Sequence, residues 1–178
     1  DDAKHMVDTA RDLRIPFLAG SSLPVAWRSP GLTLPRNCAL TEALVLGYGG
    51  LESYGFHALE TLQCMVERRQ GGETGVAAVQ AVRGEEIART EKVGRWSREL
   101  LDAAAATTPP PPKGRPKELR KDAVFYLIEY RDGLKACVAM NTGLAHEFAF
   151  AGKITGLARP QAAWFRLQEG RPYGHFEH

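Results

Sequence analysis

The sequence predicts an α+β fold in which helices cover one face of an open antiparallel sheet. After residue 123, strand-like runs follow one another through short turns, and amphipathic helical segments precede them. Residues 1–20 add a helix and a short apolar strand, which together make half of a parallel βαβ unit. We therefore expect a remnant of a parallel α/β layer, followed by the sheet domain.

The composition is typical of a globular protein and excludes several classes. The 178 residues are 44% hydrophobic and 25% charged, enough to bury a core. No apolar run approaches the roughly 18 residues of a membrane span. The 23 basic and 21 acidic side chains give no electrostatic reason to expect nucleic acid as a partner. The three cysteines form no C-x-x-C pair, so we expect no metal site and a reducing, cytoplasmic location.

The first segments indicate the end of one domain and a crossover to the next. Residues 1–14 have apolar side chains at helical spacing, and the apolar run 15–19 follows as a strand. Residues 21–37 contain three prolines and no clean period, as expected of a crossover. Because the chain starts at Asp1 without an initiator Met or a signal peptide, we expect it to be part of a longer protein.

The second part begins with a strand over 38–47, a glycine-rich turn at 47–50 and a helix over 52–69 that Gly71 and Gly72 end. The remaining elements follow in chain order: a strand over 76–82, a helix over 95–106, a Pro-rich loop over 107–116, a hairpin of strands 123–131 and 134–141, and strands 145–151 and 161–168. Several of these strands are apolar on both faces, so we expect the open face to mediate association between copies.

Nucleotide and nucleophile motifs are missing from the sequence. Neither G-x-G-x-x-G nor G-x-x-x-x-G-K-[ST] occurs, so the chain has no nucleotide site of its own. No G-x-S-x-G turn occurs either. Ser21 and Ser22 follow the expected parallel strand, at the sheet edge where α/β proteins bind ligands; the alternative is that they are simply solvated loop residues.

The densest polar group is Glu52, Ser53, His57 and Glu60, at the start of the helix over 52–69. His57 and Glu60 are three residues apart and share a helical face, so the carboxylate can orient the imidazole. This pattern predicts a general base, since imidazole exchanges protons near neutral pH. The alternative is a half-buried histidine paired with a glutamate for structural reasons. A single His-x-x-Glu offers too few ligands for a metal.

Residues 49–62, with the sequence GGLESYGFHALETL, resemble the G-G-x-x-x-D-x-G-x-H-x-x-D-x-L signature of the Gfo/Idh/MocA oxidoreductase family. The resemblance extends to residues 3–20, to Arg28 and Pro30, and to the strands within 125–141 and 148–153. One departure is that Ser53 stands where the family has an aspartate, and the nearest acid, Glu52, is displaced by one residue.

The resemblance implies that residues 1–30 are the end of a Rossmann-like nucleotide-binding domain. Residues 31–178 would be the substrate-binding and oligomerisation domain, with the family's final helix lying beyond His178. The intact protein would use NAD or NADP to oxidise a sugar, inositol or related polyol, whereas this chain alone would bind no cofactor. Homo-oligomers would form through the open sheet.

The resemblance also assigns roles to individual residues. His57 would be the general base, with Glu60, Glu52 and Ser53 as the surrounding catalytic positions. The substrate would contact a second set: Ser21, Ser22, Trp27, Arg28 and Tyr54. Because Ser53 replaces the aspartate, a non-catalytic ligand-binding or assembly protein of the same fold is the alternative.

Overall fold

The computed structural model describes residues 2–17, 20–110 and 119–166. Its elements in chain order are α1 (Asp2–Asp12), the 3-10 turn η1 (Leu23–Val25), β1 (Trp27–Ser29), β2 (Leu40–Gly47), α2 (Leu51–Val66), β3 (Val76–Arg83), α3 (Glu85–Lys92), α4 (Arg98–Thr107), β4 (Val124–Tyr130), β5 (Lys135–Met140), β6 (Phe148–Ile154) and β7 (Gln161–Arg166). The strands form one open sheet in the order β1-β7-β6-β2-β5-β4-β3. The predicted α+β class is confirmed.

The sheet is mixed, because its central pair, β2 and β5, is parallel while the other neighbours are antiparallel. The hairpin over Asp132 and Gly133 sets the direction of β5 against β4. The free edge of β5 then receives β2, which comes from far earlier in the chain. The expectation of a purely antiparallel sheet missed this pair, since hydrophobic patterns do not report strand direction.

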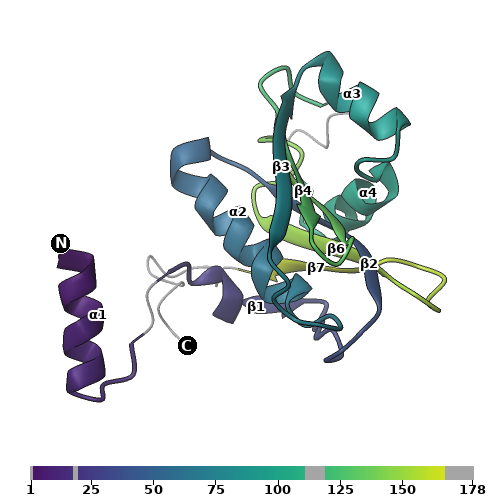
Figure 1. Ribbon diagram of the computed structural model, residues 1–178. Coiled ribbons are helices and arrows are strands. Elements are labelled where there is room, and N and C mark those ends of the chain that lie inside the picture. The colour runs from purple at the N-terminus through teal and green to yellow at the C-terminus, as the bar shows by residue number, and fades with distance from the viewer. Residues whose placement is uncertain (1, 18–19, 111–118, 167–178) are drawn as a thin grey trace.

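Helices cover both faces of the sheet, which differs from the expected single face (Figure 1). On β2, Val45 packs with Leu62 of α2, whereas Leu44 packs with Leu101 of α4 on the opposite face. Successive residues of a strand point to opposite faces, so a strand that is apolar at every position needs cover on both sides. The long apolar run of β2 is therefore covered by α2 on one face and by α4 on the other.

The N-terminal helix α1 stands apart from the sheet and the other helices (Figure 1). Residues 15–17 form neither helix nor strand, and residues 18 and 19 of the expected strand lie outside the described residues. A short apolar run needs a partner strand to complete its hydrogen bonds. The sheet begins with β1, whose Trp27 pairs with Arg166 of β7. None of the described helices is long and apolar enough to cross a membrane.

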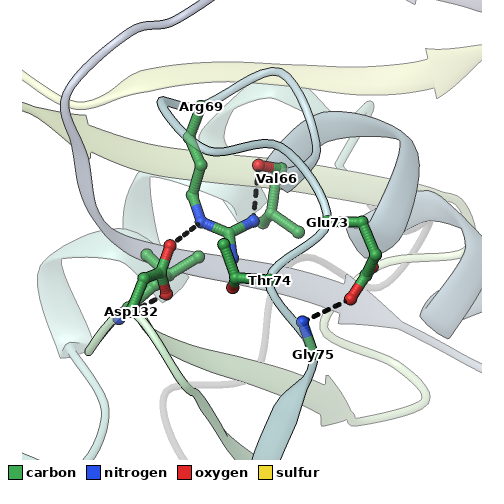
Figure 2. Close-up of polar contacts among 7 residues, drawn as sticks. Val66, Arg69, Glu73, Thr74, Gly75 and Asp132 are labelled. Atoms are coloured by element: carbon green, nitrogen blue, oxygen red, sulfur yellow. Dashed lines mark hydrogen bonds and ion pairs between the residues drawn. The ribbon is translucent and has the colours of Figure 1, made fainter.

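The side chain of Arg69, just after α2, connects three parts of the fold (Figure 2). It is 3% exposed. Its Nε donates to Asp132 at 2.7 Å, Nη1 to the Val66 carbonyl at 2.8 Å and Nη2 to Thr74 Oγ1 at 2.7 Å. The guanidinium also lies 4.6 Å from the centre of the Tyr130 ring. These contacts join the end of α2, the approach to β3 and the β4–β5 turn.

The pairing with Arg69 changes the acid–base behaviour of Asp132. The hydrogen bond from Arg69 lowers the pKa of the Asp132 carboxyl below its usual value, and the backbone N–H of Leu134 adds to this effect. A carboxyl with a lowered folded-state pKa stabilises the fold above its unfolded-state pKa of about 3.9. That contribution is lost as pH falls through the folded-state pKa.

We expect Asp132→Asn to lower the free energy of unfolding at pH 7 by about 2 kcal/mol, because buried Arg69 loses its charged partner. Urea unfolding of wild type and variant should show a constant difference from pH 7 to about pH 5 and a smaller one below about pH 4. Asp8→Asn is the control, since Asp8 forms an exposed pair with Arg11. Equal effects of the two substitutions at pH 7 would contradict this role for Arg69.

Candidate functional site

The candidate site centres on a hydrogen bond between the crossover and helix α2. Ser21 Oγ lies 2.7 Å from His57 Nδ1, although the two residues are 36 positions apart in the sequence. Ser21 is 5% exposed, and its Oγ also accepts the backbone N–H of Leu23 at 3.1 Å. His57 is half-buried on α2. The structure thus brings together two residues that the sequence analysis singled out separately.

The crossover holds Ser21 in place through its own local structure. Pro24 presets the backbone for the turn η1, and Val25 N–H donates to the Ser22 carbonyl at 3.2 Å. Leu23 is completely buried in the same core as Leu62 of α2. Burying such a leucine contributes about 2 kcal/mol, which opposes any detachment of the crossover from α2. Ser21 is therefore fixed two residues from a core anchor.

A cavity of about 420 Å³ opens beside Ser21. Gly20, Ser21 and Pro24 line it from the crossover, and α2 contributes a row of polar side chains that includes Glu60, Gln63 and Glu67. Gly20 has φ +149°, and a Cβ there would lie 3.5 Å from Glu60 Oε2. The crossover backbone therefore passes close to the Glu60 carboxylate. Ser21 and Glu60, both expected in the site, face one cavity.

Cys64 lines the same cavity and was not predicted as a site residue. Burial raises the pKa of its thiol, and nearby Arg28 partly opposes that rise. Its Sγ donates to the Thr61 carbonyl at 3.3 Å. A buried thiol of raised pKa is a poor nucleophile at neutral pH. Cys64 lies seven residues after His57, about two helical turns, so the two residues share a face of α2. This spacing is the signal in the sequence that could have identified Cys64.

Arg28 and Trp27, expected to contact substrate, do not line this cavity. Arg28 donates from Nη2 to the Pro24 carbonyl at 3.1 Å and lies 5.2 Å from the centre of the Phe165 ring. It fastens the crossover to β7. Trp27 is 63% exposed on edge strand β1. Ser22 is half-buried within the crossover, next to Ser21.

Two further predicted residues, Ser53 and Glu52, lie in the first turn of α2. Ser53 Oγ donates to the Gly50 carbonyl at 3.4 Å, which closes the start of the helix. Glu52 lines a different, apolar groove on another face of α2. Five residues along a helix correspond to a rotation of about 140°, so Glu52 and His57 point in different directions. Glu52 therefore does not place a carboxylate beside His57.

Aromatic side chains surround His57 on its other sides. Tyr54, an expected substrate contact, has its ring centre 6.2 Å from that of His57 in an edge-on arrangement. Phe148 lies 6.3 Å from His57 and 5.1 Å from Tyr48. Burial and the nearby Glu147 carboxylate raise the pKa of Tyr48 to about 12, so its phenol stays protonated. Phe148 joins the site from strand β6, which sequence spacing does not reveal.

The residues described here do not fit the pyrophosphate of a dinucleotide. The nearest glycine-rich turn, at the start of α2, places the acidic Glu52 in the first helical turn, where it would repel a phosphate. A Cβ on Gly49 would meet the Tyr54 ring at 2.7 Å, so packing against Tyr54 accounts for this glycine. Among the described residues, no group of three His, Cys, Asp or Glu side chains could hold a metal.

In comparisons with known proteins, no family model, no curated protein and no solved structure matches this chain.

We expect the chain by itself not to bind NADH, because it lacks a glycine-rich turn that could accept the pyrophosphate. Titrating the chain into NADH while following nicotinamide fluorescence should give no saturation. A dehydrogenase that carries the nucleotide-binding fingerprint serves as the positive control. Saturable binding in the low micromolar range would contradict the prediction.

Proposed function

We propose that this chain is the substrate-binding part of an NAD- or NADP-dependent oxidoreductase that acts on a sugar, inositol or related polyol. The observation that carries the proposal is the bond between Ser21 and His57 at the edge of a polar cavity. It supports the proposal because the Ser21 hydroxyl orients the His57 ring next to a cavity with polar side chains. An imidazole in that position is suited to remove a proton from a substrate hydroxyl. The resemblance over residues 49–62 suggests the reaction class.

In this proposal the chain's own residues handle the substrate hydroxyl and its proton. Glu60 and Gln63 offer hydrogen bonds to neighbouring hydroxyl groups of a polyol in the cavity. His57 takes up the proton as the hydroxyl carbon is oxidised. The oxidation would require NAD or NADP as the electron acceptor, held by residues other than those described here. No residue described here is assigned to that cofactor.

A second candidate function is polyol binding without catalysis. Ser53 Oγ donates to the Gly50 carbonyl, and Glu52 is an exposed residue at the apolar groove. Neither residue provides the carboxylate that the family signature has four positions before the histidine. Calorimetry separates the two functions, since a polyol that binds without being oxidised in the presence of NAD or NADP favours the binding protein.

We also propose that the protein acts in the cytoplasm, where free thiols persist. Cys38, Cys64 and Cys137 form no disulfide.

The catalytic proposal predicts that His57→Ala lowers turnover by about 10²- to 10⁴-fold, because a positioned base is lost. The assay follows NADH or NADPH formation by the full-length protein on a panel of sugars, inositols and related polyols. His5→Ala is the matched control, since His5 is exposed on α1. Unchanged turnover in His57→Ala, or no turnover by the wild type on any member of the panel, would contradict the proposal.

We propose in addition that copies of the chain associate through the part of the sheet that α2 leaves uncovered. An apolar groove of about 480 Å³ runs there between α2 and the strands β3 and β4. Phe56 and Leu59 of α2 and Val76 and Val79 of β3 line it, and all four are exposed. β3 is an edge strand of the sheet. An exposed apolar groove beside an edge strand is a typical association surface.

Val79→Asp is expected to convert the oligomer to a monomer, because it places a charge in an apolar contact. Sedimentation velocity at micromolar concentration measures the change. Val93→Asp is the control: Val93 is 72% exposed and Val79 61%, but Val93 follows α3, away from the groove. A wild type that sediments as a monomer, or equal effects of both substitutions, would contradict this interface.

A further inference from the structure

Strand β3 ends one side of the sheet with an unprotected edge. It is eight residues long, its only buried residue is Val82, and no strand pairs with its outer side in the described part of the chain. Proteins usually protect such an edge with charged residues, proline or a very short strand, because its unpaired backbone N–H and C=O groups can bind another strand. No charge and no proline occurs between Glu73 and Arg83. A register shift at the start of β3 leaves residues 78–83 regular, so this edge is open to a further strand.

The opposite edge of the sheet shows how this fold protects a strand. β1 has only three residues, Trp27–Ser29. Its middle residue is Arg28, and Pro30 follows directly after it. A short strand with a charge and a proline offers few backbone groups to another chain. The two edges therefore differ, and β3 is the one that can accept a strand.

Two opposite charges flank the uncharged stretch of β3, and neither has an ion-pair partner among the residues that the structure describes. Exposed Glu73 accepts hydrogen bonds from two neutral donors, Gly75 N–H at 2.6 Å and Gln63 Nε2 at 3.2 Å, the first of which Figure 2 shows. Arg83 is exposed at the other end of the strand. Eight strand residues span roughly 25 Å, so Glu73 and Arg83 cannot meet within one chain.

From these features we infer that β3 pairs antiparallel with β3 of a second copy, about a two-fold axis near Ala78. The inference rests on the association of copies proposed above and defines its geometry. At a two-fold axis, residue i of each copy faces residue j of the other. Ala78 is midway between Glu73 and Arg83 in the sequence, so each Glu73 faces Arg83 of the second copy. Two ion pairs, one at each end of the paired strands, then compensate the charges that one chain leaves unpaired.

The same pairing brings the apolar grooves of the two copies together. The two-fold axis is perpendicular to the sheet, so α2 lies on the same face in both copies and both grooves open on that face. Val79, which lines the groove, is next to Ala78 at the axis and faces the small side chain of Ala77 of the second copy. Backbone hydrogen bonds, two ion pairs and shared cover for an exposed apolar surface all favour a second copy as the strand that binds.

Charge reversal tests the pairing, with sedimentation velocity of the chain at micromolar concentration as the measurement. Glu73→Arg places arginines opposite each other at both ends of the paired strands, and Arg83→Glu places glutamates there. We expect either substitution to weaken dimerisation about ten-fold or more, because like charges directly opposite destabilise a strand pair. Arg159→Glu is the matched control: it makes the same change of charge between β6 and β7 and should leave the dimer unchanged.

Mixing the two single variants tests whether the charges meet between copies. A dimer of one Glu73→Arg chain with one Arg83→Glu chain has an arginine opposite a glutamate at both ends. We therefore expect the mixture to form heterodimers, although each variant alone dimerises weakly. A chain that carries both substitutions should regain the wild-type dimer. Failure of both recoveries, with the variants shown to be folded by circular dichroism, would overturn the pairing.

A cross-link locates the two-fold axis without changing either charge. Ala78→Cys places two thiols opposite each other across the paired strands, within the Cα distance that a disulfide spans. Under mild oxidation we expect Ala78→Cys to form a disulfide-linked dimer, whereas Val93→Cys, at an exposed position after α3, should not. Equal cross-linking of the two variants would overturn the pairing, even if a charge-reversed chain failed to fold.

The outcomes separate this pairing from the association on which it rests. A wild type that sediments as a monomer overturns both. A wild-type dimer that Val79→Asp dissociates, but that neither charge reversal weakens, overturns the edge pairing alone and indicates contact between sheet faces instead.

Discussion

The position of helix α2 is the constraint on which the site depends, and the helix is held at both ends. At its carboxyl end, Arg69 binds Val66, Thr74 and Asp132 in one buried cluster. At its start, Gly49 N–H donates to Thr142 Oγ1 at 3.0 Å, just after β5, and the Tyr54 ring stacks on Phe148. A helix anchored at both ends to the same sheet cannot tilt or slide without breaking buried hydrogen bonds. His57 lies between these two attachment points, so they fix its position relative to the sheet.

The crossover completes the site because it is held both by the core beneath α2 and by strand β7. Leu23 enters the core, and Arg28 reaches both the Pro24 carbonyl and the Phe165 ring of β7. The crossover and helix α2, each held by the sheet and its core, therefore meet at Ser21 and His57. Precise hydrogen-bond geometry between distant residues requires such support, since about 1 Å of displacement is enough to weaken proton transfer. The site is thus a product of the packing of the whole domain.

The sequence was sufficient to predict the α+β class, most strands and the helix that carries His57, because each has a clear apolar period. It did not predict the parallel pairing of β2 with β5, since that pairing joins segments about 90 residues apart. It missed α3, whose eight residues are mostly charged. Within the site, helical spacing related His57 to Glu60, and Ser21 was chosen for its place after an expected strand. Phe148 of β6 meets His57 only through the packing of α2 on the sheet, which no local pattern contains.

The hydroxyl contact of His57 shapes the chemistry that the site can support. A carboxylate beside an imidazole stabilises the imidazolium by charge, whereas a hydroxyl orients the ring without adding charge. Ser53 stands at the position where the resembled signature has an aspartate, and Ser21 is the hydrogen-bond partner of Nδ1. Among the described residues, Glu60 brings a carboxylate to the cavity that Ser21 lines. Ser21 therefore contacts the imidazole directly, while the carboxylate of Glu60 reaches the site through the cavity wall.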